Sequence, residues 1–397
     1  MTIENRKYRI VLDARGSQPG FKDHLHRGIG RFVFALAPRL PDLIPEAQFY
    51  WLFDGRFPRG DLRGLPGVQE IMTEASETRI ELPEIMRNQY VLRRALMKFK
   101  PDLTVFFRDE DALLFWRGSV LFVYDLIHFR YPDLYRLRKG FKNKIRGRLI
   151  AKMTRDADLI ITISENSRQD IEKFLQVGGD RISIVYAAID HNVFFRRSDN
   201  EILSARRKFS LPEIYFLYVG GIDPRKNVKS LIRAFALVAR KYHDISLVMA
   251  GASGGQDELA ALNFLIDELE LREKIMMPGY IPDDDLAAVY SASKALVLPS
   301  MHEGFGLPIL EAMACSTPVV ASKTSAIPEV AGDLAIYCDV GSIEDLALAM
   351  ERALLDEEER KKMKIQGPLR AQMFNWDVVA VRVASNLRML LEGRKTQ

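Results

Sequence analysis

Short runs of consecutive hydrophobic residues alternate along the chain with longer segments whose apolar positions follow a helical period. Five runs lie in the first half, at residues 9–13, 49–53, 102–107, 119–125 and 159–164. Six lie in the second half, at residues 214–220, 245–251, 274–279, 294–300, 318–322 and 334–339. A nearly continuous apolar run followed by an amphipathic segment is typical of a parallel sheet with crossover helices, so the pattern predicts an α/β protein.

The alternation is interrupted once, at residues 190–199 (DHNVFFRRSD), which have the composition of a linker. Two successive series of strands and helices indicate two doubly wound, Rossmann-like domains, which we place at residues 1–192 and 193–375. Residues 376–397 are expected to form a helix that packs back on the first domain. Ligands of open α/β sheets bind beyond the carboxyl ends of the strands, so we expect the domains to face each other across a cleft lined by strand-to-helix loops.

The 397 residues are 48% hydrophobic and 28% charged, with a formal net charge of +4. This composition is that of a globular protein and is too weakly basic to indicate nucleic-acid binding. The two cysteines, Cys315 and Cys338, have no metal-binding spacing and exclude a disulfide framework, which favours a reducing cytoplasm. There is no apolar signal core and no run of about 18 apolar residues, so we expect membrane contact, if any, at the inner face of the cytoplasmic membrane and peripheral.

One loop with candidate chemistry spans residues 218–227 (YVGGIDPRKN), between a predicted strand and a helix expected to begin near Val228. Its two glycines let a ligand approach the backbone closely, and Arg225 and Lys226 place two cations beside that approach. Asn227 is expected to cap the helix. This combination suits a pyrophosphate. On this loop alone, a turn with a solvated basic pair is the competing interpretation.

A second loop spans residues 299–314 (PSMHEGFGLPILEAMA) and follows a predicted strand that ends at Leu298. Pro308 suits the first position of a helix, and Glu311 is expected in the first turn. Free backbone N–H groups at residues 305–307 can hold an anion at the helix N-terminus. Glu303 and Glu311 are double hydrogen-bond acceptors suited to sugar diols. The competing interpretation is that Glu311 only complements the helix dipole.

Together with the turn at residues 325–330 (SAIPEV), these two loops resemble the retaining glycosyltransferases of family 4, which have the GT-B fold. The resemblance is strongest from about residue 215 to 345. It implies that Arg225 and Lys226 bind the donor diphosphate, that Glu303 contacts the transferred sugar and that Glu311 holds the ribose. The candidate donor-binding residues are Gly220, Gly221, Arg225, Lys226, Glu303, Gly304, Phe305, Gly306, Leu307 and Glu311.

The first domain is then expected to bind the acceptor. Gly28, Gly30 and Arg31 resemble the family's glycine-rich first loop, although a plain turn is an equal alternative and Val33 breaks a full dinucleotide-binding motif. Many relatives have His-Asp where this chain has Tyr124 and Asp125. Asp125 is the first candidate for acceptor binding or proton removal, and His128, which is close by, is the second. For Asp125 and for His128, the alternative interpretation is a loop residue without a chemical role. The candidate catalytic residues are Arg225, Lys226, Glu303 and Asp125.

Several other polar features are interpreted structurally. Residues 283–285 (DDD) are expected to begin a helix, residues 109–111 (DED) to be exposed, Ser164 to cap a helix and Cys315 to be buried. The six histidines show no metal-binding spacing, so no metal and no cofactor are expected.

A basic stretch without acids extends from residue 136 to 155. Its cations are Arg136, Arg138, Lys139, Lys142, Lys144, Arg146, Arg148, Lys152 and Arg155. They alternate with Leu137, Phe141, Ile145, Leu149 and Ile150 at near-helical spacing, as in an interfacial helix on anionic lipid. A lipid-diphosphate acceptor would explain such a helix, and a solvated helix face is the alternative.

We therefore expect a retaining, metal-independent hexosyltransferase. The loops resemble bacterial mannosyltransferases of lipopolysaccharide, O-antigen or exopolysaccharide assembly, which favours GDP-mannose as donor and a saccharide or lipid-linked saccharide as acceptor. The alternatives are a UDP-sugar donor, a catalytically silent sugar-nucleotide-binding scaffold and a nucleotide-sugar epimerase. Nucleic-acid binding has the weakest support.

Overall fold

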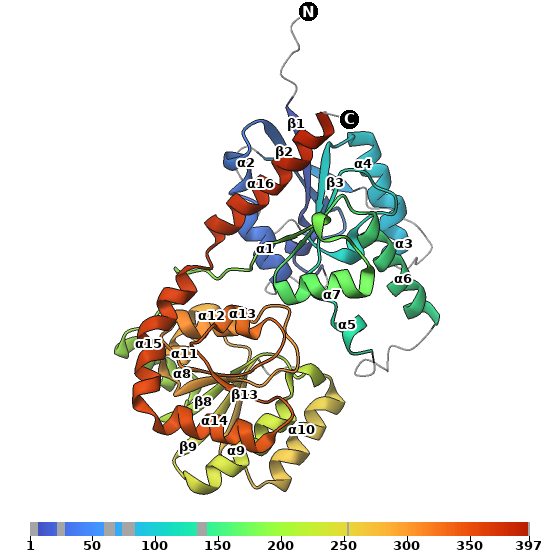
Figure 1. Ribbon diagram of the computed structural model, residues 1–397. Helices are drawn as coiled ribbons and strands as arrows, with labels where there is room; N and C mark the ends of the chain where they lie inside the picture. The colour runs from blue at the N-terminus through green and yellow to red at the C-terminus, as the bar shows by residue number, and fades with distance from the viewer. Residues whose placement is uncertain are drawn as a thin grey trace, which may run out of the picture. The chain divides into compact units, whose positions relative to one another are not determined.

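The computed structural model describes residues 7–21, 28–58, 68–73, 84–132, 141–251 and 254–395, and structural statements below refer to these. The chain divides into two compact units. Unit 1 comprises Met1–Ala187 with Trp376–Gln397, and unit 2 comprises Ala188–Asn375. The chain passes from unit 1 to unit 2 before residue 190, where the predicted linker begins, and each unit is described by itself (Figure 1).

Unit 1 contains a seven-stranded sheet in the order β3-β2-β1-β4-β5-β6-β7, with every neighbouring pair parallel. The strands are β1 Tyr8–Asp13, β2 Ala47–Asp54, β3 Val68–Thr73, β4 Leu103–Phe106, β5 Ser119–Phe122, β6 Leu159–Thr162 and β7 Ile182–Ile184. Five of these match the predicted runs. The pattern missed β3, an edge strand whose residues (VQEIMT) are half polar, and β7, which has only three residues.

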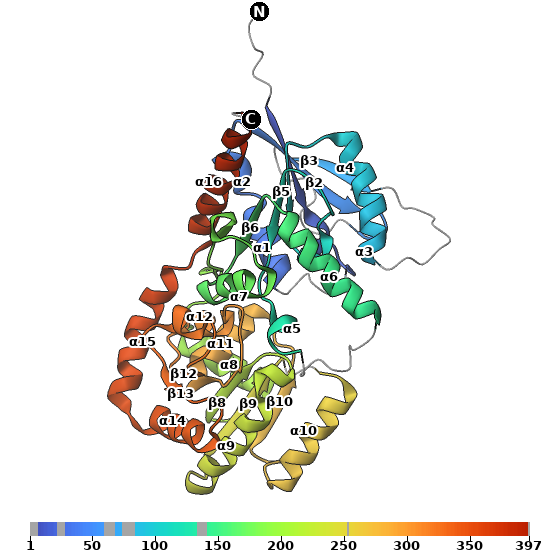
Figure 2. The same ribbon diagram turned by 45° about the vertical axis from the view of Figure 1, so that its right-hand side comes forward.

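Helices cover both faces of this sheet, with α3, α4 and α6 on one side and α1, α2 and α16 on the other (Figures 1 and 2). The helices of unit 1 are α1 Gly28–Leu36, α2 Leu40–Leu43, α3 Glu84–Arg87, α4 Arg93–Phe99, α5 Ile127–Arg130, α6 Phe141–Asp156, α7 Glu165–Leu175 and α16 Trp376–Lys395. Short 3-10 turns occupy η1 Ala14–Ser17, η4 Asp109–Asp111 and η6 Gly179–Arg181, and η3 Asn88–Leu92 is a π-helical turn.

Unit 2 contains a six-stranded sheet in the order β10-β9-β8-β11-β12-β13, again with all neighbours parallel. Its strands are β8 Ile214–Val219, β9 Ile245–Ala250, β10 Ile275–Gly279, β11 Ala295–Leu298, β12 Val319–Ser322 and β13 Ile336–Cys338. Its helices are α8 Asp199–Phe209, α9 Val228–Lys241, α10 Gln256–Glu268, α11 Asp283–Ala292, α12 Leu307–Ala314, α13 Ile327–Ala331, α14 Ile343–Leu355 and α15 Glu357–Gln372, with a 3-10 turn η7 at Pro224–Lys226. All six predicted runs contain a strand, and the predicted α/β class with two Rossmann-like sheets is confirmed.

Helix α16 belongs to unit 1 although it follows unit 2 in the sequence. The Trp376 ring packs edge-on against Phe32 of α1, with ring centroids 5.0 Å apart. Further along the helix, the Asn386 amide donates to the Ser183 hydroxyl of β7 at 2.8 Å. Helix α16 thus contacts both α1 and an edge of the sheet.

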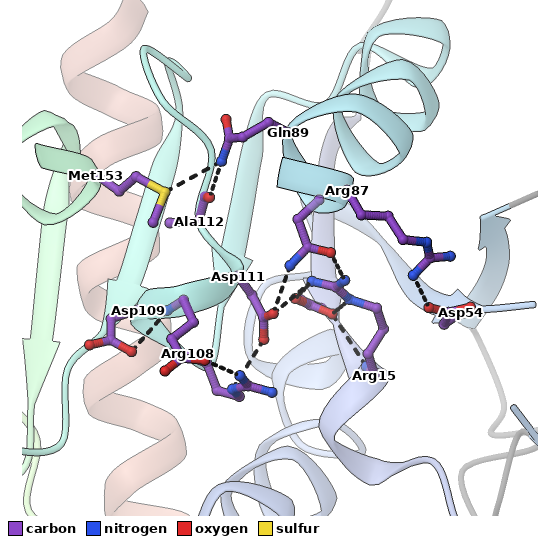
Figure 3. A network of polar contacts seen from close by, with 12 residues as sticks. Arg15, Asp54, Arg87, Gln89, Arg108, Asp109, Asp111, Ala112 and Met153 are labelled. Atoms are coloured by element: carbon purple, nitrogen blue, oxygen red, sulfur yellow. Dashed lines mark hydrogen bonds and ion pairs between the residues drawn. The ribbon is translucent and has the colours of Figure 1, made fainter. Parts of the chain in front are cut away.

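A network of buried charges lies at the carboxyl ends of β1 and β4 (Figure 3). The Arg15 guanidinium donates to Asp13 through Nε at 2.8 Å and Nη2 at 2.7 Å, and its Nη1 donates to Asn88 at 2.8 Å. Asp111 accepts from Asn88 at 3.1 Å and lies 3.4 Å from Arg108. Residues 109–111 were expected to be exposed, and this is wrong for Asp111, which is 3% exposed because two arginines pair with it.

The basic stretch lies partly outside the described residues, which omit residues 133–140 and the side chains of 141–144 and 146. Within helix α6, Ile150 is buried in the core of unit 1 and Leu149 packs against the same core. Ile145 is exposed. Two of the apolar residues expected to contact lipid therefore stabilise the fold instead. No helix in the described part of the chain is long and apolar enough to cross a membrane.

Asp54, the last residue of β2, is another buried carboxylate. It is 1% exposed and pairs with Arg56 at 2.9 Å and with Arg87 at 3.1 Å. Burial by itself raises its pKa, but the hydrogen bonds and charges of the two arginines outweigh burial and lower the pKa from 3.8 to about 2. The carboxylate therefore stabilises unit 1 fully above its unfolded pKa, and this contribution is lost as the pH falls through about 4 towards 2.

We predict that Asp54→Asn weakens the pH dependence of unfolding. Between pH 5 and pH 3, the free energy of unfolding should fall by about 1 kcal/mol less in the variant than in the wild type. All three tryptophans, Trp51, Trp116 and Trp376, lie in unit 1, so tryptophan fluorescence in urea reports this unit. The exposed Asp244→Asn in unit 2 is the control. Equal pH dependence in Asp54→Asn and wild type would contradict the assignment.

Candidate functional site

Two loops of unit 2 lie side by side because the strands that precede them are hydrogen-bonded neighbours. Strands β8 and β11 pair through Phe216 and Ala295. The sheet order also reverses here, since β9 and β10 lie on one side of β8 while β12 and β13 lie beyond β11. Open α/β sheets bind ligands at such a switch point, beyond the carboxyl ends of the strands.

The loop after β8 is shaped by Gly220. Its φ of +152° is one that L side chains rarely adopt, and a Cβ there would lie 3.0 Å from the Tyr218 hydroxyl. That hydroxyl donates to the carbonyl of Gly221 at 2.7 Å and fixes the turn. The Asp223 carboxylate then accepts from the Arg225 backbone N–H at 3.0 Å, which begins the 3-10 turn containing Arg225 and Lys226. The glycines therefore allow a turn that presents both cations.

Asn227 lies at the N-cap position of α9, but its side chain does not cap the helix. The residue has a φ of +56°, and its amide donates instead to the Val340 carbonyl at 3.2 Å. The expected side-chain cap is therefore wrong. The physical reason is that the left-handed backbone turns the amide towards the loop after β13.

Glu303, in the loop after β11, is buried at 6% exposure and joins the two loops. Its Oε1 accepts from Lys226 Nζ at 2.6 Å and from the Ser300 hydroxyl at 2.6 Å, and its Oε2 accepts from Arg225 Nη1 at 3.3 Å. Burial by itself would raise the pKa of Glu303, but the charges of Lys226 and Arg225 outweigh burial and hold that pKa below its usual range. The carboxyl is therefore an ionised acceptor at neutral pH.

The turn between Glu303 and helix α12 contains Gly306, whose φ of +106° favours glycine. Helix α12 begins at Leu307, so Pro308 occupies the second helical position. Glu311 was expected in the first turn, but it is the fifth residue of the helix and the first turn has no acid. It is buried, and its Oε2 accepts from the Tyr290 hydroxyl at 2.9 Å. Tyr290 thus fixes the carboxylate.

The structure therefore brings Arg225, Lys226 and Glu303 together in one ion cluster and holds Glu311 through a separate contact. Sequence patterns missed Ser300 and Tyr290, which orient the two carboxylates. Ser300 lies three residues before Glu303 at the end of an apolar run, which is a weak local signal. Tyr290 had no local signal, because it lies on a different helix 21 residues before Glu311.

The acceptor-side candidates lie in unit 1. Gly28 and Gly30 fall in the first turn of α1, and Arg31 follows in the same helix. Asp125 accepts from the Ile127 N–H at 3.3 Å, at the start of α5. His128 is an exposed residue of α5.

Tyr124 occupies the position at which the resemblance described above implies a histidine in many relatives. Its ring packs against Phe32 with centroids 5.3 Å apart. Burial raises the pKa of Tyr124 well above its usual range, so this side chain is neutral at physiological pH. Its hydroxyl has no hydrogen-bond partner among the described residues. Tyr124 therefore cannot supply the charge or the ring nitrogens of a histidine, and Asp125 is the nearest ionisable group in the sequence.

Two family models match the chain, one mainly in unit 1 and one within unit 2. Residues 26–193 match Glycosyltransferase Family 4, and residues 199–370 match Glycosyl transferases group 1. O-antigen chain mannosyltransferase B of Escherichia coli is 27% identical over 378 residues, which are 91% of this chain and 96% of the relative. The serotype-specific mannosyltransferase WbdA of Escherichia coli is 29% identical over 280 residues, which are 70% of this chain and 34% of the relative. This chain therefore spans about a third of WbdA.

Solved structures show the same fold. Sucrose-phosphate synthase from Thermosynechococcus elongatus aligns with a TM-score of 0.74 at 21% identity, covering 98% of this chain and 100% of that chain. Anabaena Alr3699/HepE in complex with UDP-glucose aligns with a TM-score of 0.71 at 17% identity, covering 99% of this chain and 100% of that chain.

We predict that Lys226 and Glu303 depend on each other for stability. Lys226→Met alone should lower the free energy of unfolding by about 3 kcal/mol, because the buried Glu303 carboxylate loses its ion pair with Lys226. Adding Glu303→Gln should restore part of that loss in a double-mutant cycle followed by calorimetry.

The matched control is the Lys241–Glu351 pair, which has the same 2.6 Å length but an exposed lysine. Lys241→Met should change the free energy of unfolding by less than about 1 kcal/mol. Strictly additive effects of the Lys226 and Glu303 substitutions would show that the buried pair is not energetically coupled.

Proposed function

Because the chain belongs to the glycosyltransferases that join a Glycosyltransferase Family 4 domain to a Glycosyl transferases group 1 domain, we propose that it transfers mannose from GDP-mannose with retention of anomeric configuration. The proposed acceptor is a saccharide or lipid-linked saccharide of a bacterial surface polysaccharide. Similarity to O-antigen mannosyltransferases supports the sugar and the acceptor class. The observation that carries the chemistry is the Arg225–Glu303–Lys226 cluster at the switch point of unit 2.

In the proposed reaction, the donor diphosphate binds at Arg225 and Lys226, which are held beside Glu303 when no donor is present. The bond between the anomeric carbon and the diphosphate oxygen breaks, and the acceptor hydroxyl oxygen forms the new bond on the same face of the sugar. The two cations stabilise the charge that develops on the departing nucleoside diphosphate, which is the largest electrostatic contribution such a site offers. The acceptor proton passes to Asp125 or to the departing phosphate.

Glu303 has two roles in this proposal. It keeps both cations in position before the donor arrives, and its carboxylate then accepts hydrogen bonds from the hydroxyls of the transferred sugar. Glu311, oriented by Tyr290, accepts from the ribose hydroxyls. Carboxylates suit vicinal diols because each presents two acceptor oxygens.

A UDP-sugar donor is the main alternative, and it is favoured by the Anabaena neighbour solved with UDP-glucose. A catalytically silent scaffold is a second alternative, and Tyr124 in the usual histidine position is the observation that favours it. We place the enzyme in the cytoplasm, where a lipid-diphosphate acceptor would bring it to the inner face of the membrane.

We predict that the wild type transfers mannose from GDP-mannose and that Lys226→Met lowers kcat by about 10²–10³, as expected for the loss of one charge-stabilising donor. Product formation is followed by mass spectrometry, and the anomeric configuration of the product is determined by NMR. Lys241→Met, a lysine on the far end of α9, should retain wild-type turnover.

The outcomes of this assay separate the alternatives. Faster transfer from a UDP-sugar than from GDP-mannose would show that the donor is a UDP-sugar. Inversion of the anomeric configuration in the product would refute the proposed retention. Tight donor binding without transfer in the wild type would favour the scaffold. Conversion of the donor sugar without any acceptor would indicate an epimerase.

We also propose that no divalent metal takes part, because Arg225 and Lys226 supply two positive charges for the diphosphate. Transfer should therefore be unchanged, within about twofold, after exhaustive dialysis against EDTA. Loss of transfer that Mg²⁺ or Mn²⁺ restores would overturn metal independence while leaving the donor site in place.

A further inference from the structure

A second cluster of charged and polar side chains lies at the carboxyl edge of the unit 1 sheet, away from the acceptor-side candidates. Asp54 ends β2 and Thr73 ends β3, and the two are partners in the parallel register. Paired residues of neighbouring strands project to the same face of a sheet, with the strands about 4.8 Å apart. The two side chains are therefore neighbours at the edge where α/β proteins bind ligands.

Among the residues that the structure describes, this cluster carries an excess of positive charge. One carboxylate, that of Asp54, pairs with two guanidiniums, those of Arg56 and Arg87. The Gln18 side chain forms two hydrogen bonds with the backbone of Asp54. It accepts from the N–H at 2.7 Å and donates to the carbonyl at 3.0 Å. Counting described side chains only, these two guanidiniums and one carboxylate sum to one positive charge. Asp54 and Arg87 are buried, and Arg56 is exposed.

Two donors in this cluster have no hydrogen-bond partner in the described part of the chain. They are Nη2 of Arg87, which is 9% exposed, and the hydroxyl of Thr73, which is 4% exposed. A third such donor, Nη1 of Arg108, follows β4 at the same edge. Buried unsatisfied polar groups are few in native proteins and each costs free energy, so several at one ligand-binding edge require an explanation. Donors with excess positive charge suit a group that offers several anionic oxygens.

The position of the cluster limits which part of a substrate reaches it. In the sheet order, β2 is separated from β5 by β1 and β4, so three strand spacings, roughly 14 Å, lie between Asp54 and the Asp125 loop. That span exceeds one hexose ring. An anionic group bound at Asp54 therefore does not belong to the hexose whose hydroxyl reacts near Asp125.

We propose that Arg56, Arg87 and Thr73 form a phosphoryl-binding subsite for the acceptor, which carries its phosphate or diphosphate at least one sugar away from the reacting hydroxyl. This inference rests on the proposed glycosyl transfer for its biological meaning, but the binding of a phosphoryl group does not depend on it. Arg108 lies between this subsite and the Asp125 loop and contacts the connecting part of the acceptor.

The test separates binding from folding through two threonines that each end a strand. The Thr73 hydroxyl has no described partner, so Thr73→Val should leave the melting temperature unchanged or raise it. Thr162 ends β6, and its hydroxyl donates to the Val123 carbonyl at 2.7 Å. Thr162→Val is therefore the matched control, which should lower the melting temperature without changing phosphoryl binding.

Inorganic pyrophosphate is the probe, titrated calorimetrically into the full chain. The donor site is first neutralised by Arg225→Met, Lys226→Met and Glu303→Gln together. We expect one saturable site. Its affinity for pyrophosphate should fall about fivefold in Thr73→Val, which loses one neutral hydrogen bond, and about tenfold in Arg87→Lys, which loses one charge-assisted hydrogen bond. The subsite would be overturned if no saturable binding were seen, or if Thr73→Val and Arg87→Lys bound pyrophosphate as tightly as the protein without these substitutions.

A second arm compares acceptors in the otherwise wild-type enzyme. An oligosaccharide, its phosphate monoester and its alkyl diphosphate are assayed for transfer. The KM of the phosphorylated acceptors should be lower than that of the unmodified one, and Arg87→Lys should raise it. A preference for the monoester identifies a soluble sugar phosphate, and a preference for the alkyl diphosphate identifies a lipid-linked acceptor. If no acceptor is used, the proposed transfer fails while the pyrophosphate titration still decides the subsite.

Discussion

The ion cluster of Glu303 with Arg225 and Lys226 joins the two loops on which the candidate donor site depends. A buried carboxylate is costly unless it is paired and hydrogen-bonded, and here two cations and the Ser300 hydroxyl compensate it. The cations reach it only because β8 and β11 are adjacent and because Gly220 allows a turn that other residues rarely adopt. Backbone conformation, strand order and charge therefore depend on one another at this point of unit 2.

Such a cluster also explains how a site can be preorganised before its ligand arrives. Glu303 holds two cations, one of which, Arg225, also lies 3.5 Å from the partly exposed Asp223, so both cations are in position for a diphosphate without reorganisation of the fold. A similar arrangement occurs in unit 1, where Arg56 and Arg87 share Asp54. Each cluster lies at the carboxyl edge of its sheet. The same physical solution, a buried carboxylate that positions two cations, thus recurs in both units.

Local sequence patterns predicted what depends on local physics. Buried strands appear as apolar runs, so the central strands of both sheets were predicted, whereas the edge strand β3 was missed. Patterns failed where a distant partner decides the outcome. Asp111 is buried because it pairs with Arg15, which lies 96 positions earlier, and Glu311 is oriented by Tyr290 from another helix. The two glycine-containing loops of unit 2 were recognisable because their glycines and charged residues follow one another at characteristic distances in the sequence. No such distance specifies the donor base or the acceptor.

A crystal structure of the enzyme with an intact nucleotide-sugar donor tests directly whether the Arg225–Glu303–Lys226 cluster binds the donor diphosphate. We expect the diphosphate to contact Arg225 and Lys226, the 2.6 Å contact between Lys226 Nζ and Glu303 to lengthen, and Glu303 to accept from the sugar hydroxyls. A donor bound away from these residues, with the Lys226–Glu303 contact unchanged, would contradict it.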